Sequence, residues 1–475
     1  MIVAALEHRH QRYLSFLLED APTNGTPAVL HLFTRLEDWM KEFAPNGCMS
    51  INALAAYPEN LSINQAVKQH KLAVRQLMGQ LSQREDLATT LFLLHEGLSN
   101  AWPVLGHAAF ASAETHSART NEGEQSMTTI PKVMKGVQLI GHGGPDMLRY
   151  RDDLPVPVPS PDDVLIQVAA AGVNNTDINT RTAWYSKNDA NSMDASWSGD
   201  ALSLPRIQGA DVCGTIVAVG ENICPSRIGQ RVLIEPCITR FHSQALSSPW
   251  YFGSECDGGF AQFTVVDSKH AYAVNSSLSD IDLASFPCSY STAENMLVRS
   301  NVTASDTVLI SGASGGVGSA AIQLAKARGA YVIAIASPEK KEQITALGAN
   351  QVIPRDANLP ATLGENSVDV VIDLVAGEQW PQFLQVLKPG SRYAVSGAIG
   401  GPIVELDVRT LYLKDLALFG CTVLAPEVFG NLVRYIEQNA IRPLVAESFP
   451  LNQIGQAQEV FSRKQHTGKL VLEIT

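Results

Sequence analysis

The chain has 475 residues, of which 45% are hydrophobic and 17% are charged, and its formal net charge at pH 7 is -12. The length allows two or three domains with cores of their own, and the composition is typical of a globular protein. The negative charge disfavours a nucleic acid as partner, and no stretch approaches the roughly 20 apolar residues that a membrane span needs. We therefore expect no nucleic-acid partner, no membrane partner and a cytoplasmic location.

The seven cysteines stand at positions 48, 213, 224, 237, 256, 288 and 421. Their odd number and wide spacing fit reduced thiols better than a disulfide framework. This also agrees with a cytoplasmic location.

Residues 1–118 are predicted to form an all-helical domain. Apolar residues recur there at helical spacing, in two runs: Val29, Leu32, Phe33, Leu36, Trp39, Met40 and Phe43, and then Leu87, Leu91, Leu94, Leu98 and Trp102. The polar stretch from Ser117 to Ser126 breaks this periodicity. We predict an exposed linker over residues 119–131.

Residues 132–287 are predicted to be rich in β-structure. Short alternating or β-branched runs occur at 164–169, 214–219 and 231–234, with glycine and proline between them. From 288 to 424 the pattern changes to apolar runs that alternate with helical segments, at 307–310, 331–336, 368–375 and 392–396. This alternation predicts βαβ units and a parallel sheet. Residues 425–475 end in a further predicted strand, 469–474.

A glycine turn joins the first of these parallel strands to a helix. The turn reads Gly312-Ala313-Ser314-Gly315-Gly316-Val317-Gly318, and a segment of helical spacing follows from Ser319. Glycines let the backbone approach a pyrophosphate, whose charge meets the free N–H groups at the helix start. A tight structural turn would use glycine as well, but the βαβ context favours a dinucleotide. The predicted cofactor-binding residues here are Gly312, Ser314, Gly315, Gly316, Val317 and Gly318.

Residues 132–475 resemble the medium-chain dehydrogenase/reductase superfamily, in particular its zinc-free quinone oxidoreductase-like branch. The resemblance depends on several ordered motifs: Ala171 to Asp177, Gly209-Ala210-Asp211, Asp257 to Ala261, the glycine turn, and Leu347-Gly348-Ala349. It implies a GroES-like catalytic domain at 132–287, a Rossmann domain at 288–424, a C-terminal segment at 425–475 that returns to the first domain, and a homodimer.

The resemblance also implies that both zinc sites of the alcohol dehydrogenases are absent. The positions that match their catalytic ligands are Asn174, Ala210 and Cys288, and one thiolate cannot hold a catalytic zinc, which needs about three protein ligands. No close cysteine spacing occurs between Cys237 and Cys256 for a structural zinc. We therefore predict no metal.

Without a metal, a conjugated acceptor is the expected substrate, because a quinone or an α,β-unsaturated carbonyl spreads the negative charge that hydride transfer creates. The predicted catalytic residues are Asn174, Thr176 and Asp177. Thr176 matches a proton-relay hydroxyl of the zinc enzymes, although it is as readily a structural threonine. Asp177 and Arg181 are expected to pair and hold the loop. Aromatic residues at Trp184, Tyr185, Trp197 and 250–252 line the acceptor pocket or anchor loops; the sequence leaves both readings open.

After the second parallel strand the chain reads Ser337-Pro338-Glu339-Lys340, and no acidic residue stands at the strand tip to bind ribose hydroxyls. Ser337 and Lys340 resemble the pair that meets the 2′-phosphate in NADPH-using relatives. The predicted cofactor is therefore NADPH rather than NADH, and Ser396 completes the predicted site.

The helical domain resembles the C-terminal ligand-binding and dimerisation domain of TetR-type regulators, through residues 47–52 and the helices that follow. The helix-turn-helix that would precede it is absent from the chain. Two hypotheses remain for these helices: a dimerisation surface only, or a site for a small apolar effector. For the whole chain, a zinc-type alcohol dehydrogenase and a non-catalytic NADPH-responsive sensor are the alternatives to a reductase.

Overall fold

The structure is a computed structural model that describes residues 2–107, 110, 130–186, 196–199 and 201–474. The chain forms two compact units, Met1–Thr129 and Ile130–Thr475. The predicted linker at 119–131 falls almost wholly outside the described residues. Among the helices that are described, none is both long enough and apolar enough to cross a membrane.

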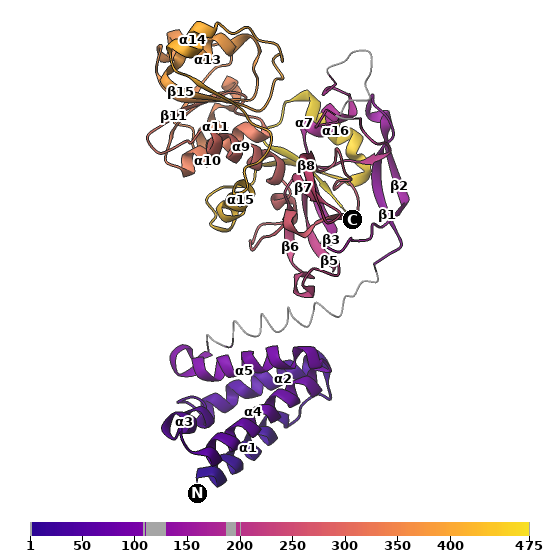
Figure 1. The fold of residues 1–475 in the computed structure, drawn as a ribbon, viewed down its shortest axis with the longest axis vertical. Coiled ribbons are helices and arrows are strands. Elements are labelled where there is room, and N and C mark those ends of the chain that lie inside the picture. Colours follow the sequence, from indigo (N-terminus) through magenta and orange to yellow (C-terminus); the bar gives the residue numbers. More distant parts are fainter. Residues whose placement is uncertain (1, 108–109, 111–129, 187–195, 200, 475) are drawn as a thin grey trace. The chain divides into compact units, whose positions relative to one another are not determined.

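The first unit is helical, as predicted (Figure 1). The apolar run on the second helix is buried almost completely, from Val29 to Met40, because its spacing places these side chains on one face. In the later run Leu91 and Leu98 are buried, and the other members pack at the edge of the same core. The helices are α1 (Ile2–Leu18), α2 (Gly25–Glu42), α3 (Met49–Ala56), α4 (Leu61–Ser82) and α5 (Glu85–Leu105).

The second unit begins with a β-rich part. Its main sheet has the strand order β10-β6-β5-β3-β18-β17, with β9 also paired to β3; β2-β1-β4 form a small sheet and β7-β8 a hairpin. The strands are β1 (Val133–Leu139), β2 (Leu148–Pro155), β3 (Asp163–Val173), β4 (Arg206–Ile207), β5 (Asp211–Val219), β6 (Arg231–Ile234), β7 (Cys237–Phe241), β8 (Gln244–Tyr251), β9 (Phe263–Asp267) and β10 (Ala271–Ala273). One short helix, α7 (Asn175–Arg181), follows β3 directly.

The α/β part has a six-stranded parallel sheet in the order β13-β12-β11-β14-β15-β16. Its strands are β11 (Thr307–Ile310), β12 (Tyr331–Ile335), β13 (Gln351–Ile353), β14 (Val368–Asp373), β15 (Leu387–Val395) and β16 (Ala417–Gly420). Its helices, together with those that lead into and out of it, are α8 (Asp280–Leu283), α9 (Pro287–Arg299), α10 (Gly316–Ala327), α11 (Lys341–Ala346), α12 (Leu359–Leu363), α13 (Trp380–Val386), α14 (Val408–Leu413) and α15 (Val428–Glu437).

The C-terminal segment returns to the β-rich part of the unit. It contains β17 (Val445–Pro450), α16 (Ile454–Arg463) and β18 (Lys469–Glu473). Strand β18 lies antiparallel to β3, with Leu470 opposite Val173, and parallel to β17. In Figure 1 these yellow elements lie beside the purple strands. The return places the start of β18 next to the end of β3.

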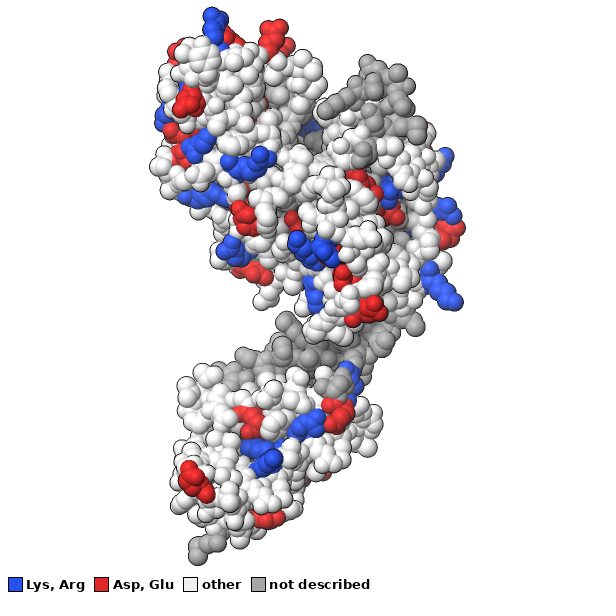
Figure 2. All heavy atoms as spheres, viewed as in Figure 1, with Lys and Arg blue, Asp and Glu red and all other residues white. Residues whose placement is uncertain are grey.

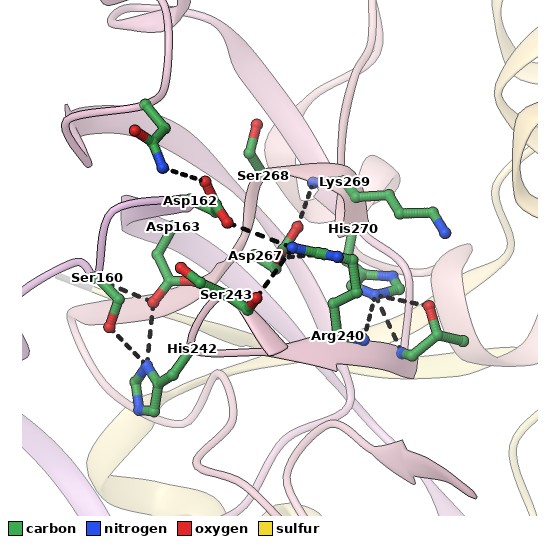
Figure 3. A network of polar contacts seen from close by, with 12 residues as sticks. Ser160, Asp162, Asp163, Arg240, His242, Ser243, Asp267, Ser268, Lys269 and His270 are labelled. Carbon is green, nitrogen blue, oxygen red and sulfur yellow. Dashed lines mark hydrogen bonds and ion pairs between the residues drawn. The ribbon is translucent and has the colours of Figure 1, made fainter. Parts of the chain in front are cut away.

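The β7–β8 hairpin is held to the main sheet by a network of polar contacts (Figure 3). Arg240 Nε donates to Asp267 Oδ2 at 3.0 Å, and Arg240 Nη2 lies 3.3 Å from Asp162 Oδ2. The backbone N–H of Thr239 donates to His270 Nε2 at 3.0 Å. This hairpin lies in the stretch between Cys237 and Cys256, so ion pairs and hydrogen bonds fix that segment.

Charged side chains of both signs are interspersed on the molecular face drawn in Figure 2. That face, over its described atoms, has no broad patch of lysine and arginine. The described atoms of this face thus form no basic surface of the kind that contacts a nucleic-acid backbone, in line with the net charge of -12.

Candidate functional site

The glycine turn lies at the carboxyl end of β11, in the middle of the parallel sheet. The neighbours of β11 are β12 on one side and β14 on the other, so the strand order changes direction here. Ligands of open α/β sheets bind at such a switch point. Gly312 has φ +57°, and α10 begins at Gly316 with Gly315 as the preceding cap residue. The turn therefore presents the free N–H groups of a twelve-residue helix to the crevice.

The glycines of this turn do not all serve the same purpose. A side chain at Gly318 would collide with the Gly312 carbonyl oxygen, and one at Gly316 would lie 2.6 Å from Ser289 Oγ. At Gly315, which is exposed, the nearest atom to such a Cβ would be the Gly312 carbonyl oxygen at 3.4 Å. Gly316 and Gly318 thus meet packing requirements, whereas Gly315 leaves space for a ligand. Val317 is half-buried in the first turn of α10.

The predicted residues beyond β12 have a cation beside them that the sequence analysis missed. Lys340 is half-buried, and its Nζ donates to the His466 carbonyl oxygen at 2.7 Å. Burial, and then the positive charge of Arg355, lowers the pKa of Lys340. Arg355 Nη2 also donates to Ser314 Oγ at 3.4 Å. Arg355 therefore connects the glycine turn with the region of Ser337 and Lys340.

Ser396 lies just beyond β15, and its backbone N–H donates to the Asp373 carbonyl oxygen at 3.1 Å. It is half-buried. Because β15 and β14 are parallel neighbours, Ser396 lies at the same edge of the sheet as the glycine turn.

A buried polar cluster lies where β3 ends and β5 and β18 begin. Lys469 Nζ lies 2.6 Å from Asp211 Oδ2 and donates to Asn174 Oδ1 at 2.5 Å. Asn174 Nδ2 donates to Asp211 Oδ2 at 2.9 Å, and the Cys288 backbone N–H donates to Asp211 Oδ1 at 2.5 Å. The side chains of Lys469 and Asp211 are 3% and 0% exposed. We call Asn174, Asp211 and Lys469 the lysine triad.

The lysine triad adjoins the glycine turn. A Cβ placed on Gly316 would lie 3.2 Å from Lys469 Cδ. The start of α10 therefore packs against the stem of this lysine. The C-terminal strand thus links the polar cluster with the glycine turn.

Ala210, Tyr251 and Cys288 form a small buried cluster beside the triad, with Trp197 packed against it. Tyr251 OH and Cys288 Sγ are 3.0 Å apart, and the ring of Trp197 stacks on Tyr251 with 5.1 Å between centroids. Of the predicted aromatic residues, Trp197 and Tyr251 thus lie near Cys288. Trp250 packs against Phe241 in the hairpin instead.

The loop after β3 carries the other predicted catalytic residues. Thr176 is half-buried, and its Oγ1 accepts a hydrogen bond from Tyr185 OH at 3.1 Å. Asp177 is buried, and its Oδ2 accepts from the backbone N–H of Asn174 at 2.8 Å, which stabilises the start of α7. Burial raises the pKa of Asp177 to about 7, while the Asn174 N–H and Lys469 act in the opposite direction.

The expected pairing of Asp177 with Arg181 is wrong. Arg181 donates from Nε to Gln458 Oε1 at 2.8 Å, on α16, and from Nη1 to the Gly143 carbonyl oxygen. Both residues still hold the loop, but Asp177 does so through the backbone of its own helix and Arg181 through α16.

The residues at this site do not fit a zinc ion. Of the three positions that match catalytic zinc ligands, Cys288 alone carries a side chain that commonly binds zinc, and a catalytic site needs about three protein ligands. Ala210 offers no donor atom, and the amide of Asn174 is bonded to Asp211 and Lys469. Across the described part of the chain, no group of three or more His, Cys, Asp or Glu residues could hold a metal ion.

Sequence reasoning did not assign a site role to three residues of this region: Arg355, Asp211 and Lys469. Asp211 belongs to the motif Gly209-Ala210-Asp211, and Lys469 is the first residue of a predicted strand, but neither pattern predicts that the two side chains form an ion pair. A signal for Lys469 did exist. A charged residue at the start of an otherwise apolar strand is rarely buried without a partner.

Comparisons with known proteins match the second unit. The family model described as an alcohol dehydrogenase GroES-like domain matches residues 160–276, and the one described as a zinc-binding dehydrogenase matches 316–438. Quinone oxidoreductase of Mus musculus is 30% identical over 362 residues, which cover 73% of this chain and 99% of that protein. The NADPH-dependent alkenal/one oxidoreductase of Arabidopsis thaliana chloroplasts is 29% identical over 366 residues, or 76% of this chain and 85% of that one.

Among solved structures, a protein of Sinorhizobium meliloti 1021, provisionally named an alcohol dehydrogenase, is 43% identical. It superimposes with a TM-score of 0.68 over 74% of this chain and 99% of its own.

Proposed function

Because the chain belongs to the medium-chain dehydrogenase/reductase superfamily, it is an oxidoreductase, and we propose that it reduces a quinone or an α,β-unsaturated carbonyl with NADPH and without zinc. The GroES-like and Rossmann-type parts supply the two halves of such an enzyme. The names of the mouse and Arabidopsis relatives support this substrate class, and the second also supports NADPH.

The observation that carries the proposal is the lysine triad. The position that matches a zinc ligand is Asn174, and its side chain is hydrogen-bonded to a buried ammonium and a buried carboxylate. Without a Lewis acid, an alcohol is a poor hydride donor, since its developing alkoxide charge lacks a counter-charge. A conjugated acceptor needs only hydrogen-bond donors at its oxygen. The site therefore favours reduction of such acceptors.

Thr176 is the proposed donor to the acceptor oxygen. Its Oγ1 accepts from Tyr185 OH, and no acceptor for its own hydrogen occurs among the hydrogen bonds of the described residues. That hydrogen is then able to bond a carbonyl oxygen of the substrate. Asn174 acts as a positioning residue, because it fixes the start of α7 through its backbone and joins this loop to Asp211 and Lys469 through its amide.

The nucleotide is assigned to the glycine turn and the residues beyond β12. The N–H groups at the start of α10 would bind its pyrophosphate, with Gly315 leaving space for it. Ser337, Lys340 and Arg355 would bind a 2′-phosphate, because cationic donors make strong hydrogen bonds to phosphate. When bound, NADPH supplies the hydride, and the protein orients it against the acceptor.

The test measures oxidation of NADPH and of NADH with 1,4-benzoquinone and with methyl vinyl ketone, before and after dialysis against a zinc chelator. We expect turnover with NADPH that dialysis does not change. Turnover that requires one zinc per chain, or oxidation of simple alcohols in preference to enone reduction, would contradict the proposal.

A matched pair of variants tests the role of Thr176. Replacing it, Thr176→Val, removes the proposed donor, and kcat should fall at least roughly tenfold with little change in stability. Thr182→Val, at the other end of α7, should leave kcat unchanged. Among the described residues, the hydroxyl that it removes bonds only to the backbone of its own helix. If the two variants lowered kcat equally, Thr176 would not be the hydrogen-bond donor to the acceptor oxygen.

The helical unit lies outside the matched residues 160–276 and 316–438. Its TetR-like ancestry, a homodimer and a cytoplasmic location remain predictions from the sequence. A chain that starts at Met127, compared with the full chain in kinetics and oligomeric state, tests whether these helices contribute to a homodimer.

A further inference from the structure

The helical unit contains a cavity among α1, α2, α4 and α5. The space available to the centres of water molecules is about 60 Å³, enough for roughly five waters. One side of the cavity is apolar, formed by Leu6, Leu36, Trp39, Met40 and Val74. A ligand that fits would be small and partly apolar.

The other side of the cavity carries a cysteine beside an ammonium group. Lys71 Nζ lies 3.3 Å from Cys48 Sγ and 2.5 Å from Glu96 Oε2. Glu96 Oε1 lies 3.0 Å from His95 Nδ1, and His95 Nε2 is hydrogen-bonded to Tyr13 OH. The sulfur of a cysteine is the nucleophile in thiol chemistry, and here an ammonium group that can donate a proton lies beside it. Cys48 is half-buried and lines the cavity.

A second group in the same lining lacks a partner. His70 is 7% exposed, and its Nδ1 is buried with no hydrogen-bond partner among the described residues. Its ring stacks on His10, with 4.1 Å between centroids. Burial lowers the pKa of both rings, that of His10 to about 4, so both are neutral at pH 7. Buried polar groups normally find a partner, and a ligand oxygen in this cavity would provide one for His70.

We infer that this cavity captures a small α,β-unsaturated carbonyl compound covalently on Cys48. The Cys48 sulfur gives its proton to water and forms an S–C bond to the β-carbon while the C=C π bond breaks. Its electron pair moves through the α-carbon to the carbonyl oxygen as an enolate, and a proton from the Lys71 ammonium then reaches the α-carbon. The thiol has added across the double bond, Lys71 is recharged from water, and no oxidant or reductant is needed.

The choice of ligand rests on the proposed function, because enones are the proposed substrates of the second unit. The cavity adds three requirements of its own: an electrophilic carbon for the thiol, an oxygen for the polar side, and a size of about five non-hydrogen atoms, taking the volume per water as the guide. Methyl vinyl ketone meets all three. One chain would then both reduce such electrophiles and record their presence.

The experiment treats the full chain with methyl vinyl ketone in the absence of NADPH and follows the adducts by peptide mass spectrometry. Cys224 is the internal comparison, since it is exposed and its hydrogen bond to Ser226 lowers its pKa. We expect Cys48 to react at least ten times faster than Cys224. With chalcone, which carries two phenyl groups and exceeds the cavity, Cys224 should react and Cys48 should not. Equal rates at the two thiols, or equal reaction of Cys48 with both enones, would overturn the inference.

Two lysine variants separate the cavity chemistry from simple exposure. Lys71→Met should slow the Cys48 adduct at least tenfold, whereas Lys68→Met, an exposed lysine on the same helix, should not. NADPH-dependent reduction should be unchanged in both. If the chain reduces enones with NADPH but Cys48 is not alkylated, this inference alone is rejected. If Cys48 is alkylated but no enone is reduced, the proposed function alone is rejected. If Lys71→Met fails to fold, the comparison of the two enones on the natural chain still decides.

Discussion

Two lysines illustrate different uses of a buried ammonium group in this molecule. Lys469 is 3% exposed and is bonded to a carboxylate and to an amide oxygen. Lys71 is 19% exposed and lies between a carboxylate and a sulfur atom at the wall of a cavity. The first is enclosed by protein oxygen atoms and holds three strand ends in place. The second lies beside the Cys48 sulfur at the cavity, where a ligand could reach both groups, so we expect it to contribute more to reactivity than to stability.

The largest effect expected from this difference concerns stability. Lys469→Met leaves the Asp211 carboxylate buried without its cation, which should lower the free energy of unfolding by about 3–5 kcal/mol in urea titrations. The control is Lys388→Met, whose partly exposed ion pair with Asp369 is expected to contribute less than about 1 kcal/mol. The double variant Asp211→Asn with Lys469→Met should recover part of the loss. If Lys469→Met and Lys388→Met lowered the free energy of unfolding by similar amounts, burial of the Lys469–Asp211 pair would not be the cause of the loss.

The carboxyl group of Asp177, near the same lysine, predicts an unusual dependence of stability on pH. Its pKa is raised to about 7 by burial, against about 3.9 in an unfolded chain, so the unfolded state releases the proton first. The contribution to stability is therefore complete below about pH 4 and is lost as the pH rises toward 7, by up to roughly 4 kcal/mol in total.

Urea unfolding at pH 5 and pH 7.5 measures this loss, and Asp177→Asn should remove the difference. Asp407→Asn should leave it, because Arg409 lowers the pKa of this exposed carboxyl, which is then ionised throughout that range. If the free energy of unfolding rose from pH 5 to pH 7.5, and Asp177→Asn removed that rise, the raised pKa of Asp177 would be contradicted.

A smaller effect is expected at the nucleotide crevice. Arg355→Leu removes a cation that lies beside Ser314 and Lys340. It should weaken NADPH binding by roughly 2 kcal/mol, which raises the KM for NADPH about thirtyfold, and should change the KM for NADH little. Arg409→Leu is the control, since its exposed side chain bonds Asp407 and no other of the described residues. Equal loss of NADH and NADPH in Arg355→Leu would place Arg355 away from the 2′-phosphate.

The smallest effect sharpens the contrast between the two lysines. Lys71→Met should lower the free energy of unfolding by only about 1 kcal/mol, because Glu96 keeps His95 as a partner and is itself partly exposed. Calorimetry of the full chain measures it. A loss as large as that in Lys469→Met would show that Lys71 is a structural residue first.

The parallel sheet could be predicted from the sequence more completely than the lysine triad. The strand predicted at 307–310 is observed with the same bounds, and α10 starts within the glycine turn, because apolar runs and glycines act locally. The contact of Lys469 with Asn174 joins residues 295 positions apart and depends on the register of β18 on β3. Neither strand contains a local signal that fixes that register.

The wrong pairing of Asp177 with Arg181 has a physical cause. Their spacing on one helix favours an ion pair, but Asp177 is the third residue of α7 and bonds the free N–H group of Asn174 instead. Arg181 then finds Gln458 on a distant helix. Arg355 was missed for a similar reason, since its proximity to Ser314 depends on how β13 lies beside β12.

The position of β18 also sets an order of assembly during synthesis. A ribosome translates Asn174 and Asp211 long before Lys469, so the nascent β3–β5 pair carries a carboxylate whose counter-charge has not yet been made. The closing strand supplies it only after the whole nucleotide-binding sheet has left the exit tunnel. The residue that is made last, Lys469, also packs against the start of α10, since a Cβ on Gly316 would lie 3.2 Å from its Cδ.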